Sequence, residues 1–186
     1  MITVVSGLPR SGTSLIMQML QKGGMGILTD NVRQADESNP KGYFEYEKVK
    51  ALQRDSSWLK NADGKAVKII AQLLRYLPGE FEYKVIFIER VMEEIMNSQQ
   101  KMLENMGQKT QSLNTVLSNI FRKQIEDTKK WLETQHNIST LYMTHTDAIF
   151  HARETAKQIN EFLGFNLKEK NMMQVVDHSL YRQRAR

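Results

Sequence analysis

A strand, a glycine-bounded loop and a helix follow one another within residues 2–21, and this segment constrains the fold more than any other. Residues 2–5 form an apolar run typical of a buried strand, Gly7 and Gly12 bound the loop, and residues 14–21 are amphipathic. The glycines let the backbone curl so that successive N–H groups point inward, and a helix start adds partial positive charge. The segment therefore predicts a phosphate-binding loop.

The rest of the chain alternates between strand and helix patterns. We expect strands over 2–6, 65–70, 83–89 and 138–143, and helices over 13–23, 46–58, 91–106, 112–135, 147–163 and 167–174. Such alternation predicts an α/β fold of three layers, α/β/α, with a mostly parallel central sheet. With 186 residues and no linker, the chain is expected to form a single domain over 1–186. The polar residues 107–112 are expected to form a lid-like turn.

The bulk composition favours an anionic ligand. The net charge is +5, and the basic residues are scattered except at 182–186, with no nucleic-acid-binding motif beside them. We therefore expect no nucleic-acid partner. No apolar stretch of about 20 residues exists, which argues against a membrane span, and because residues 2–5 already read as a strand we expect no signal peptide. A cytoplasmic protein is the simplest expectation, and the sequence does not indicate its oligomeric state.

The position of its cation distinguishes this loop from the phosphate-binding loop of a nucleotide triphosphatase. Such an enzyme carries a lysine after the second glycine, where this chain has Thr13, and the cation is instead Arg10. Residues 9–14 follow the pattern proline, arginine or lysine, serine, glycine, threonine, and then serine or threonine. This pattern resembles the 5′-phosphosulfate loop of sulfotransferases that use 3′-phosphoadenosine 5′-phosphosulfate (PAPS). The resemblance implies that the cofactor is held by Gly7, Pro9, Arg10, Ser11, Gly12, Thr13 and Ser14.

A second pair of residues matches the same family. Arg90 closes the predicted strand 83–89, and Ser98 follows eight residues later in the next helix. In PAPS enzymes an arginine and a serine in this arrangement clamp the 3′-phosphate of the cofactor. A guanidinium group offers bidentate contact to a phosphate, which a nearby hydroxyl completes. The resemblance covers roughly residues 2–105 and 138–165.

The resemblance implies transfer of a sulfuryl group to a hydroxyl or amine by in-line displacement. Arg10 is then expected to stabilise the negative charge on the leaving bridging oxygen, and it acts electrostatically because arginine keeps its proton. The sulfuryl group carries less charge than a γ-phosphate, so no metal ion is required. The acceptor is expected to be a small molecule or a glycan, and its identity is left open.

Two further residues are candidates for the chemistry at the acceptor. Residues 39–45 resemble an Asn-Pro-x-Gly-aromatic-aromatic-Glu segment of bacterial sulfotransferases, in which Glu45 is the acid near the acceptor. Its aromatic neighbours predict a raised pKa suited to a general base, although Glu45 at a helix start is the alternative. Asp36 and Glu37 are weaker candidates. Lys68 is expected to face the sulfuryl group or the acceptor, unless it is a solvated lysine at a strand edge.

The chain departs from the family at its end. It has no Arg-Lys-Gly-x-x-Gly-x-Trp-Lys segment of the kind that covers the 3′-phosphate, and Arg182 or Arg184 is proposed to take that place. His145 follows a strand end and is therefore a candidate to enter the cleft, but we expect it instead to be a polar residue with satisfied hydrogen bonds.

Two other functions stay open. The first is an atypical nucleotide kinase or NTPase, in which Glu89 at a strand end would bind magnesium. The second is a non-catalytic nucleotide-binding protein.

Overall fold

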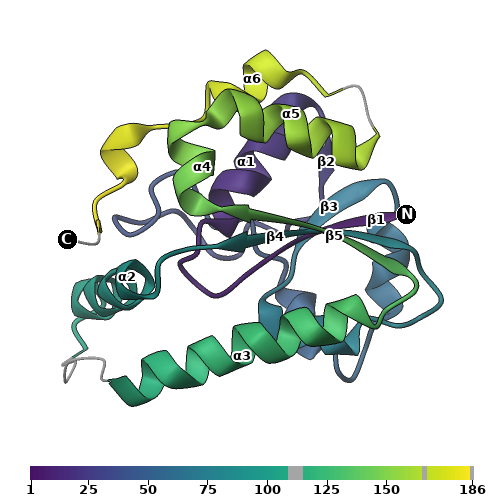
Figure 1. Cartoon of the computed structure of the whole chain (residues 1–186), viewed down its shortest axis with the longest axis horizontal. Coiled ribbons are helices and arrows are strands. Elements are labelled where there is room, and N and C mark those ends of the chain that lie inside the picture. Colours follow the sequence, from purple (N-terminus) through teal and green to yellow (C-terminus); the bar gives the residue numbers. More distant parts are fainter. Residues whose placement is uncertain (109–114, 165–166, 185–186) are drawn as a thin grey trace.

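The protein is built around one five-stranded parallel sheet (Figure 1). The computed structural model describes residues 1–108, 115–164 and 167–184. Across the sheet the strands are β2 (Gly26–Ile27), β3 (Lys65–Lys68), β1 (Ile2–Ser6), β4 (Tyr83–Glu89) and β5 (Ile138–Thr144), and every neighbouring pair is parallel. This confirms the predicted fold class.

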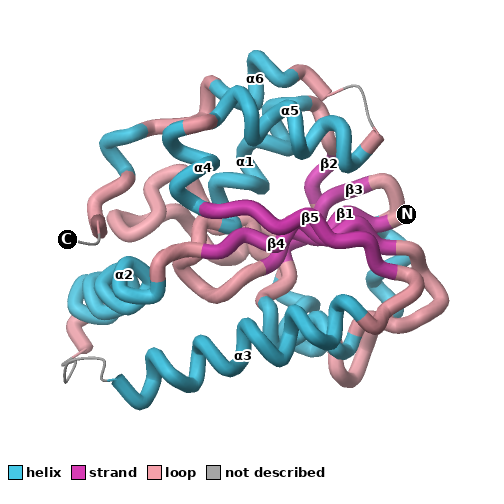
Figure 2. The backbone as a smooth tube through the Cα atoms, viewed as in Figure 1, coloured by secondary structure: helices cyan, strands magenta, loops and turns pink. Residues whose placement is uncertain are grey.

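Helices cover both faces of the sheet (Figures 1 and 2). One face carries α1 (Thr13–Gly23), α4 (His145–Phe150), α5 (Ala152–Leu163) and α6 (Glu169–Met173). The other carries α3 (Thr115–Glu133) and the short 3-10 helices η1 (Glu47–Ala51), η2 (Ser57–Ala62) and η3 (Ala71–Tyr76). Helix α2 (Met92–Asn105) follows β4, and η4 (His178–Leu180) lies near the C-terminus. In the described part of the chain, no helix has both the length and the hydrophobicity needed to cross a membrane.

Each face of the sheet has its own apolar core. In β1, Val5 packs with α1 and α5, whereas Ile2 and Val4 pack on the opposite side with η2 and η3. Strands buried on both faces read as continuous apolar runs, which is why β1 and β4 were recognisable in the sequence.

Two predicted helices differ from the structure. The helix expected over 46–58 is replaced by η1 and the start of η2, because Asp55 interrupts it: its carboxylate accepts a hydrogen bond from Ser57 N (2.9 Å), and its carbonyl accepts one from Trp58 Nε1 (3.1 Å). The helix expected over 147–163 is broken at His151, which leaves helical geometry between α4 and α5. The helix begins two residues earlier than expected, at residue 145, because the Thr144 hydroxyl accepts a capping hydrogen bond from Asp147 N (3.0 Å).

The strand register brings four chain segments together at one edge of the sheet. Val5 lies opposite Lys68, Ser6 opposite Phe87, and Glu89 opposite Thr144. The loop after β1, the residues after β3 and β4, and the start of α4 therefore meet at the carboxyl edge, where parallel α/β sheets bind ligands. Of the predicted lid-like turn, residues 109–112 lie outside the described residues.

Candidate functional site

A cavity of about 570 Å³ lies at the carboxyl edge of the sheet. Its walls are the loop after β1, the end of β3, helix α2, the segment 29–46 and the C-terminal segment 177–184. The volume falls within the range of small-molecule sites in proteins. The walls carry several cations, namely Arg10, Arg33, Lys41, Lys68, Arg90, Lys101 and Arg182. The cavity therefore suits an anionic ligand.

The loop after β1 is held in a shape that two glycines make possible. A Cβ atom on Gly7 would lie 2.4 Å from the Ile88 carbonyl oxygen, and one on Gly12 would lie 2.5 Å from Cδ2 of His145. Gly12 also has a φ of 107°. Between them, Ser11 N donates to Leu8 O (3.1 Å), and the turn leaves Arg10 with a φ of 71°. A positive φ at an arginine is strained, as residues at functional sites often are.

The first turn of α1 forms one wall of the cavity. Thr13 is its first residue, and the Gly12 carbonyl before it accepts from Leu15 N (3.0 Å) and Ile16 N (3.4 Å). The N–H groups of Thr13 and Ser14 come ahead of every carbonyl that a helix bond could reach. Thr13 and Ser14 both line the cavity. Backbone donors and two hydroxyls thus converge where the helix begins.

Arg10 contacts the serine that the second motif identified. Its Nε donates to Ser98 Oγ (3.0 Å), and its Nη2 donates to the Ser38 carbonyl (2.8 Å). Burial lowers the pKa of Arg10, partly offset by Tyr43, but a guanidinium stays protonated at any ordinary pH. The two candidate motifs, 88 residues apart in sequence, therefore meet in one place.

Arg90 is buried beside the same loop and makes three hydrogen bonds. Its Nη1 donates to the carbonyl of Arg10 (3.1 Å) and its Nη2 to the carbonyl of Gln183 (2.9 Å). Its Nε donates to Glu94 Oε2 at 2.8 Å, one turn along α2. Arg90 thus joins the loop, the helix and the C-terminal segment.

Sequence reasoning missed Glu94 and Tyr181. The Tyr181 hydroxyl donates to Glu94 Oε1, and this hydrogen bond raises the pKa of Tyr181. The four-residue spacing of Arg90 and Glu94 gave no helix-face signal, because Arg90 precedes α2, which begins at Met92. Nothing in the sequence near Tyr181 indicates its partner, which is 87 residues away.

The C-terminal segment also reaches across the cavity through Arg182. Its Nη1 donates to the carbonyl of Glu37 (3.1 Å), and its side chain lines the cavity. Arg184 instead turns back, with its Nε donating to the Tyr181 carbonyl (3.2 Å). Of the two arginines considered from the sequence, Arg182 is the one at the cavity.

Lys68 lies in the cavity wall, so the alternative of a solvated strand-edge lysine is wrong. Its Nζ donates to the Tyr43 carbonyl (2.7 Å) and to Ser14 Oγ (3.2 Å), and it lies 3.8 Å from Glu45 Oε1. Burial lowers the pKa of Lys68 to about 8, with Glu45 opposing the shift and Arg33 and Arg10 adding to it. Lys68 therefore loses its proton more easily than an exposed lysine does.

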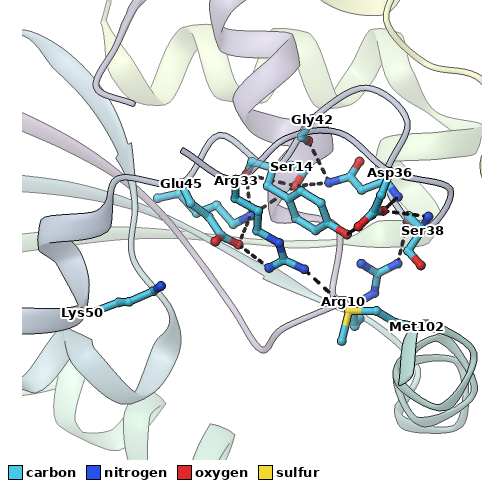
Figure 3. A network of polar contacts seen from close by, with 12 residues as sticks. Arg10, Ser14, Arg33, Asp36, Ser38, Gly42, Glu45, Lys50 and Met102 are labelled. Carbon is cyan, nitrogen blue, oxygen red and sulfur yellow. Dashed lines mark hydrogen bonds and ion pairs between the residues drawn. The ribbon is translucent and has the colours of Figure 1, made fainter. Parts of the chain in front are cut away.

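Glu45 lies beside two cations, and one of its three aromatic sequence neighbours, Tyr46, packs elsewhere. Its Oε1 accepts from Arg33 Nη1 at 3.0 Å (Figure 3) and lies 3.8 Å from Lys68 Nζ. Its side chain is 31% exposed. Tyr46 instead packs edge-on against Trp58, with 5.4 Å between ring centroids. Glu45 also precedes η1, so it does not start a helix. Its role as a base stays a prediction.

Arg33 closes the cavity on this side, and no motif pointed to it. Its guanidinium carbon lies 3.5 Å above the ring of Tyr43, and Figure 3 shows its side chain between Glu45 and Met102. The Tyr43 hydroxyl in turn donates to Asp36. Burial alone would raise the pKa of Asp36, but the hydrogen bonds donated by Tyr43, Asn39 N and Ser38 N lower it overall. Asp36 therefore shapes the segment 29–46 and is a poor base.

His145 does not have the satisfied hydrogen bonds that were expected for it. Its ring lines the cavity beside Gly12, and its Nδ1 is buried with no hydrogen-bond partner among the described residues. Burial, assisted by Arg90, lowers the pKa of His145 to about 4, with Glu94 opposing. The ring is neutral at pH 7.

No family model matches the chain, and no curated protein matches it. Among solved structures, it is similar to a mouse sulfotransferase, SULT7A1, in complex with PAP, with a TM-score of 0.55 and 16% identity over 99% of this chain and 66% of that one. It is also similar to the sulfotransferase domain from the curacin biosynthetic pathway, with a TM-score of 0.60 and 13% identity over 95% of this chain and 77% of that one.

These likenesses show the fold, an α/β architecture shared with sulfotransferases. The chain spans 66% of the mouse protein's length. A sugar kinase from a Janibacter species, unliganded, also matches over 95% of this chain and 98% of that one at 12% identity, but its TM-score of 0.43 carries no argument.

Proposed function

We propose that this chain is a sulfotransferase that moves the sulfuryl group of PAPS to a hydroxyl or amine acceptor. The contact of Arg10 with Ser98, beside the Arg90 guanidinium, carries the proposal. These residues come from two separate sequence motifs of the resemblance, and the fold brings them into one cavity. The shared fold with two sulfotransferase structures supports the same reading.

The residues present fit such a cofactor. Gly7 and Gly12 let the loop pack closely against Ile88 and His145, and the start of α1 offers N–H groups with the hydroxyls of Thr13 and Ser14. These groups, with Pro9 and Ser11 shaping the loop, would hold the 5′-phosphosulfate end. Arg90, Ser98 and Arg182 would hold the 3′-phosphate. When bound, PAPS supplies the sulfuryl group.

The chain's own residues would then divide the chemistry. Arg10 would stabilise the charge on the bridging oxygen without giving up a proton. Glu45 would accept the proton of the acceptor hydroxyl, since its carboxylate lies at the cavity with one face exposed. Lys68, held by Ser14 Oγ and the Tyr43 carbonyl, would orient or stabilise the transferred group. None of these roles requires a metal ion.

The partner is proposed to be a small-molecule or glycan acceptor in a cytoplasmic setting, with no nucleic acid. Arg33, Glu45 and Lys68 form one polar wall of the cavity, which favours an acceptor with hydrogen-bonding groups.

A kinase or NTPase is less well supported by the site. Glu89, which would bind magnesium in that case, instead accepts from Lys129 Nζ at 2.9 Å and is not among the residues that line the cavity. A non-catalytic nucleotide-binding protein would use the same cavity and differ only in turnover.

A transfer assay separates these functions. The full chain is incubated with radiolabelled PAPS and a panel of phenols, amines, monosaccharides and oligosaccharides, and labelled product is followed chromatographically. Labelled acceptor, absent without protein, is the expected result. Binding of PAPS with no product from any acceptor in the panel would favour the non-catalytic alternative.

A further inference from the structure

The orientation of Arg90 depends on a buried carboxylate that the sequence motifs did not include. Glu94 Oε2 accepts from Arg90 Nε at 2.8 Å, and the exposed fractions of the two side chains are 3% and 9%. A buried charge pair is stable only when its geometry is good and its remaining polar atoms find partners. For Glu94, the second oxygen takes the hydroxyl of Tyr181.

Tyr181 connects this pair to the C-terminal segment. That segment runs from α6 past α4 and ends beside α2 (Figure 1). The ring of Tyr181 packs edge-on against His145, with centroids 5.4 Å apart, and against Phe150 at 5.7 Å. The guanidinium carbon of Arg90 lies 5.6 Å from the same ring centroid. The tyrosine is therefore fixed by packing as well as by its hydroxyl.

Among the described residues, the three hydrogen bonds of Arg90 leave binding capacity on its two terminal nitrogens. A guanidinium has five N–H donors, four of them on the terminal nitrogens. Glu94 takes the fifth, on Nε, while the carbonyls of Arg10 and Gln183 take one hydrogen from each terminal nitrogen. Because the Glu94 carboxylate binds the Nε–H donor and not the terminal nitrogens, it fixes the plane of the Arg90 guanidinium.

We propose that Glu94 and Tyr181 are positioning residues that hold Arg90 in the orientation that recognises a 3′-phosphate. This inference rests on the proposed function, in which Arg90 contacts that phosphate. Tyr181 fixes Glu94, Glu94 fixes the guanidinium, and recognition of the nucleotide thereby depends on the C-terminal segment.

The test compares two ligands that differ only in the 3′-phosphate, adenosine 3′,5′-bisphosphate (PAP) and adenosine 5′-monophosphate (AMP). Calorimetric dissociation constants give an AMP-to-PAP ratio for the full chain, expected to be about tenfold or more in the wild type. Arg90→Lys, which loses the fork, should bring the ratio close to one. Tyr181→Phe removes one hydroxyl and should lower the ratio about three- to tenfold with the AMP constant unchanged.

Glu94→Gln keeps the size of the side chain and removes its charge, and it should lower the ratio at least as much as Tyr181→Phe. Tyr83→Phe is the matched control, because the Tyr83 hydroxyl is also part-buried and donates to the Pro78 carbonyl (3.1 Å) in the core on the opposite face of the sheet. It should leave the ratio unchanged. If Glu94→Gln does not fold, Tyr181→Phe alone decides the matter.

The outcomes distinguish failure of the positioning role from failure of the proposed function. Wild-type ratios in Tyr181→Phe and Glu94→Gln, with a lost ratio in Arg90→Lys, would overturn the positioning role and leave the proposed function intact. A higher ratio in Glu94→Gln would show that the carboxylate competes with the ligand for Arg90, which also overturns it. A wild-type ratio near one would remove Arg90 from phosphate recognition, and with it both proposals.

Discussion

The Nε atom of Arg10 donates a 3.0 Å hydrogen bond to the hydroxyl of Ser98, joining the loop after β1 to the second turn of α2. Arg90 reinforces this junction by donating to the carbonyl of Arg10. The cation proposed for the reaction, Arg10, is thus hydrogen-bonded to two of the residues proposed for the 3′-phosphate, Ser98 and Arg90. A change in any of them is expected to affect both binding and rate.

Loss of the Arg10 side chain should remove transition-state stabilisation. For Arg10→Ala we expect a fall in kcat of about a hundredfold, corresponding to about 3 kcal/mol, with the fold intact. Single-turnover transfer from PAPS measures it, and circular dichroism checks the fold. Wild-type turnover in this variant would exclude Arg10 from the mechanism.

The backbone at Arg10 predicts an unusual order of stabilities. Because Arg10 has a φ of 71°, glycine fits this position without strain and alanine does not. Arg10→Gly should therefore be more stable than Arg10→Ala by about 1 kcal/mol, although both lose the same hydrogen bonds. Urea unfolding of the two variants tests this. An alanine variant as stable as the glycine variant would argue against the strained turn.

Substituting two glycines with similar backbone angles distinguishes the cost of a steric clash from the cost of backbone strain. Gly12 and Gly24 have φ values of 107° and 105°, but only at Gly12 would a Cβ meet another residue, 2.5 Å from the His145 ring. Gly24→Ala should cost about 1 kcal/mol of unfolding free energy, and Gly12→Ala should cost clearly more. Gly12→Ala should also abolish PAP binding. Equal costs in urea unfolding would contradict the packing of His145 on the loop.

Lys68 should make stability depend on pH in a defined direction. Its pKa is lowered from 10.5 to about 8 in the folded protein, so between these values the unfolded chain binds more protons. The free energy of unfolding should then rise with pH from about 8 to about 10.5, because the cost of burying the charged amine is relieved.

The measurement is urea unfolding of the wild type and of Lys68→Met at several pH values. The difference between the two cancels the titration of other groups. The wild type should gain about 1–3 kcal/mol relative to the variant over this window. A flat difference would mean that the folded structure does not lower the pKa of Lys68.

Local patterns in the sequence were enough to predict the loop, β1, β4 and the spacing of Arg90 and Ser98. Each of these lies within one short stretch, where apolar runs, glycines and helix periodicity act directly on the backbone. Strand β2 has two residues and no apolar run of its own, so it depends on pairing with β3. The break after η1 depends on hydrogen bonds that the Asp55 carboxylate and carbonyl accept from Ser57 N and Trp58 Nε1, which compete with a helix.

The parts of the site that sequence could not predict are those made by long-range contacts. Arg33 stacks on Tyr43 and pairs with Glu45, but it lies in a segment without regular structure. Tyr181 meets Glu94 only because the C-terminal segment returns to α2. The ion pairs of Glu45 with Arg33 and Lys68 were not foreseen for the same reason. Adjacency in sequence also does not fix which way a ring points, as the packing of Tyr46 on Trp58 shows.

Thermal unfolding with PAP, and separately with ATP and magnesium, tests the central claim most directly. A ligand at about 100 times its dissociation constant adds roughly 2.7 kcal/mol to the unfolding free energy, which corresponds to about 5–10 °C in midpoint for a chain of this size. The account predicts such a shift with PAP and little with magnesium ATP. A shift with magnesium ATP alone would contradict it and favour a kinase or NTPase.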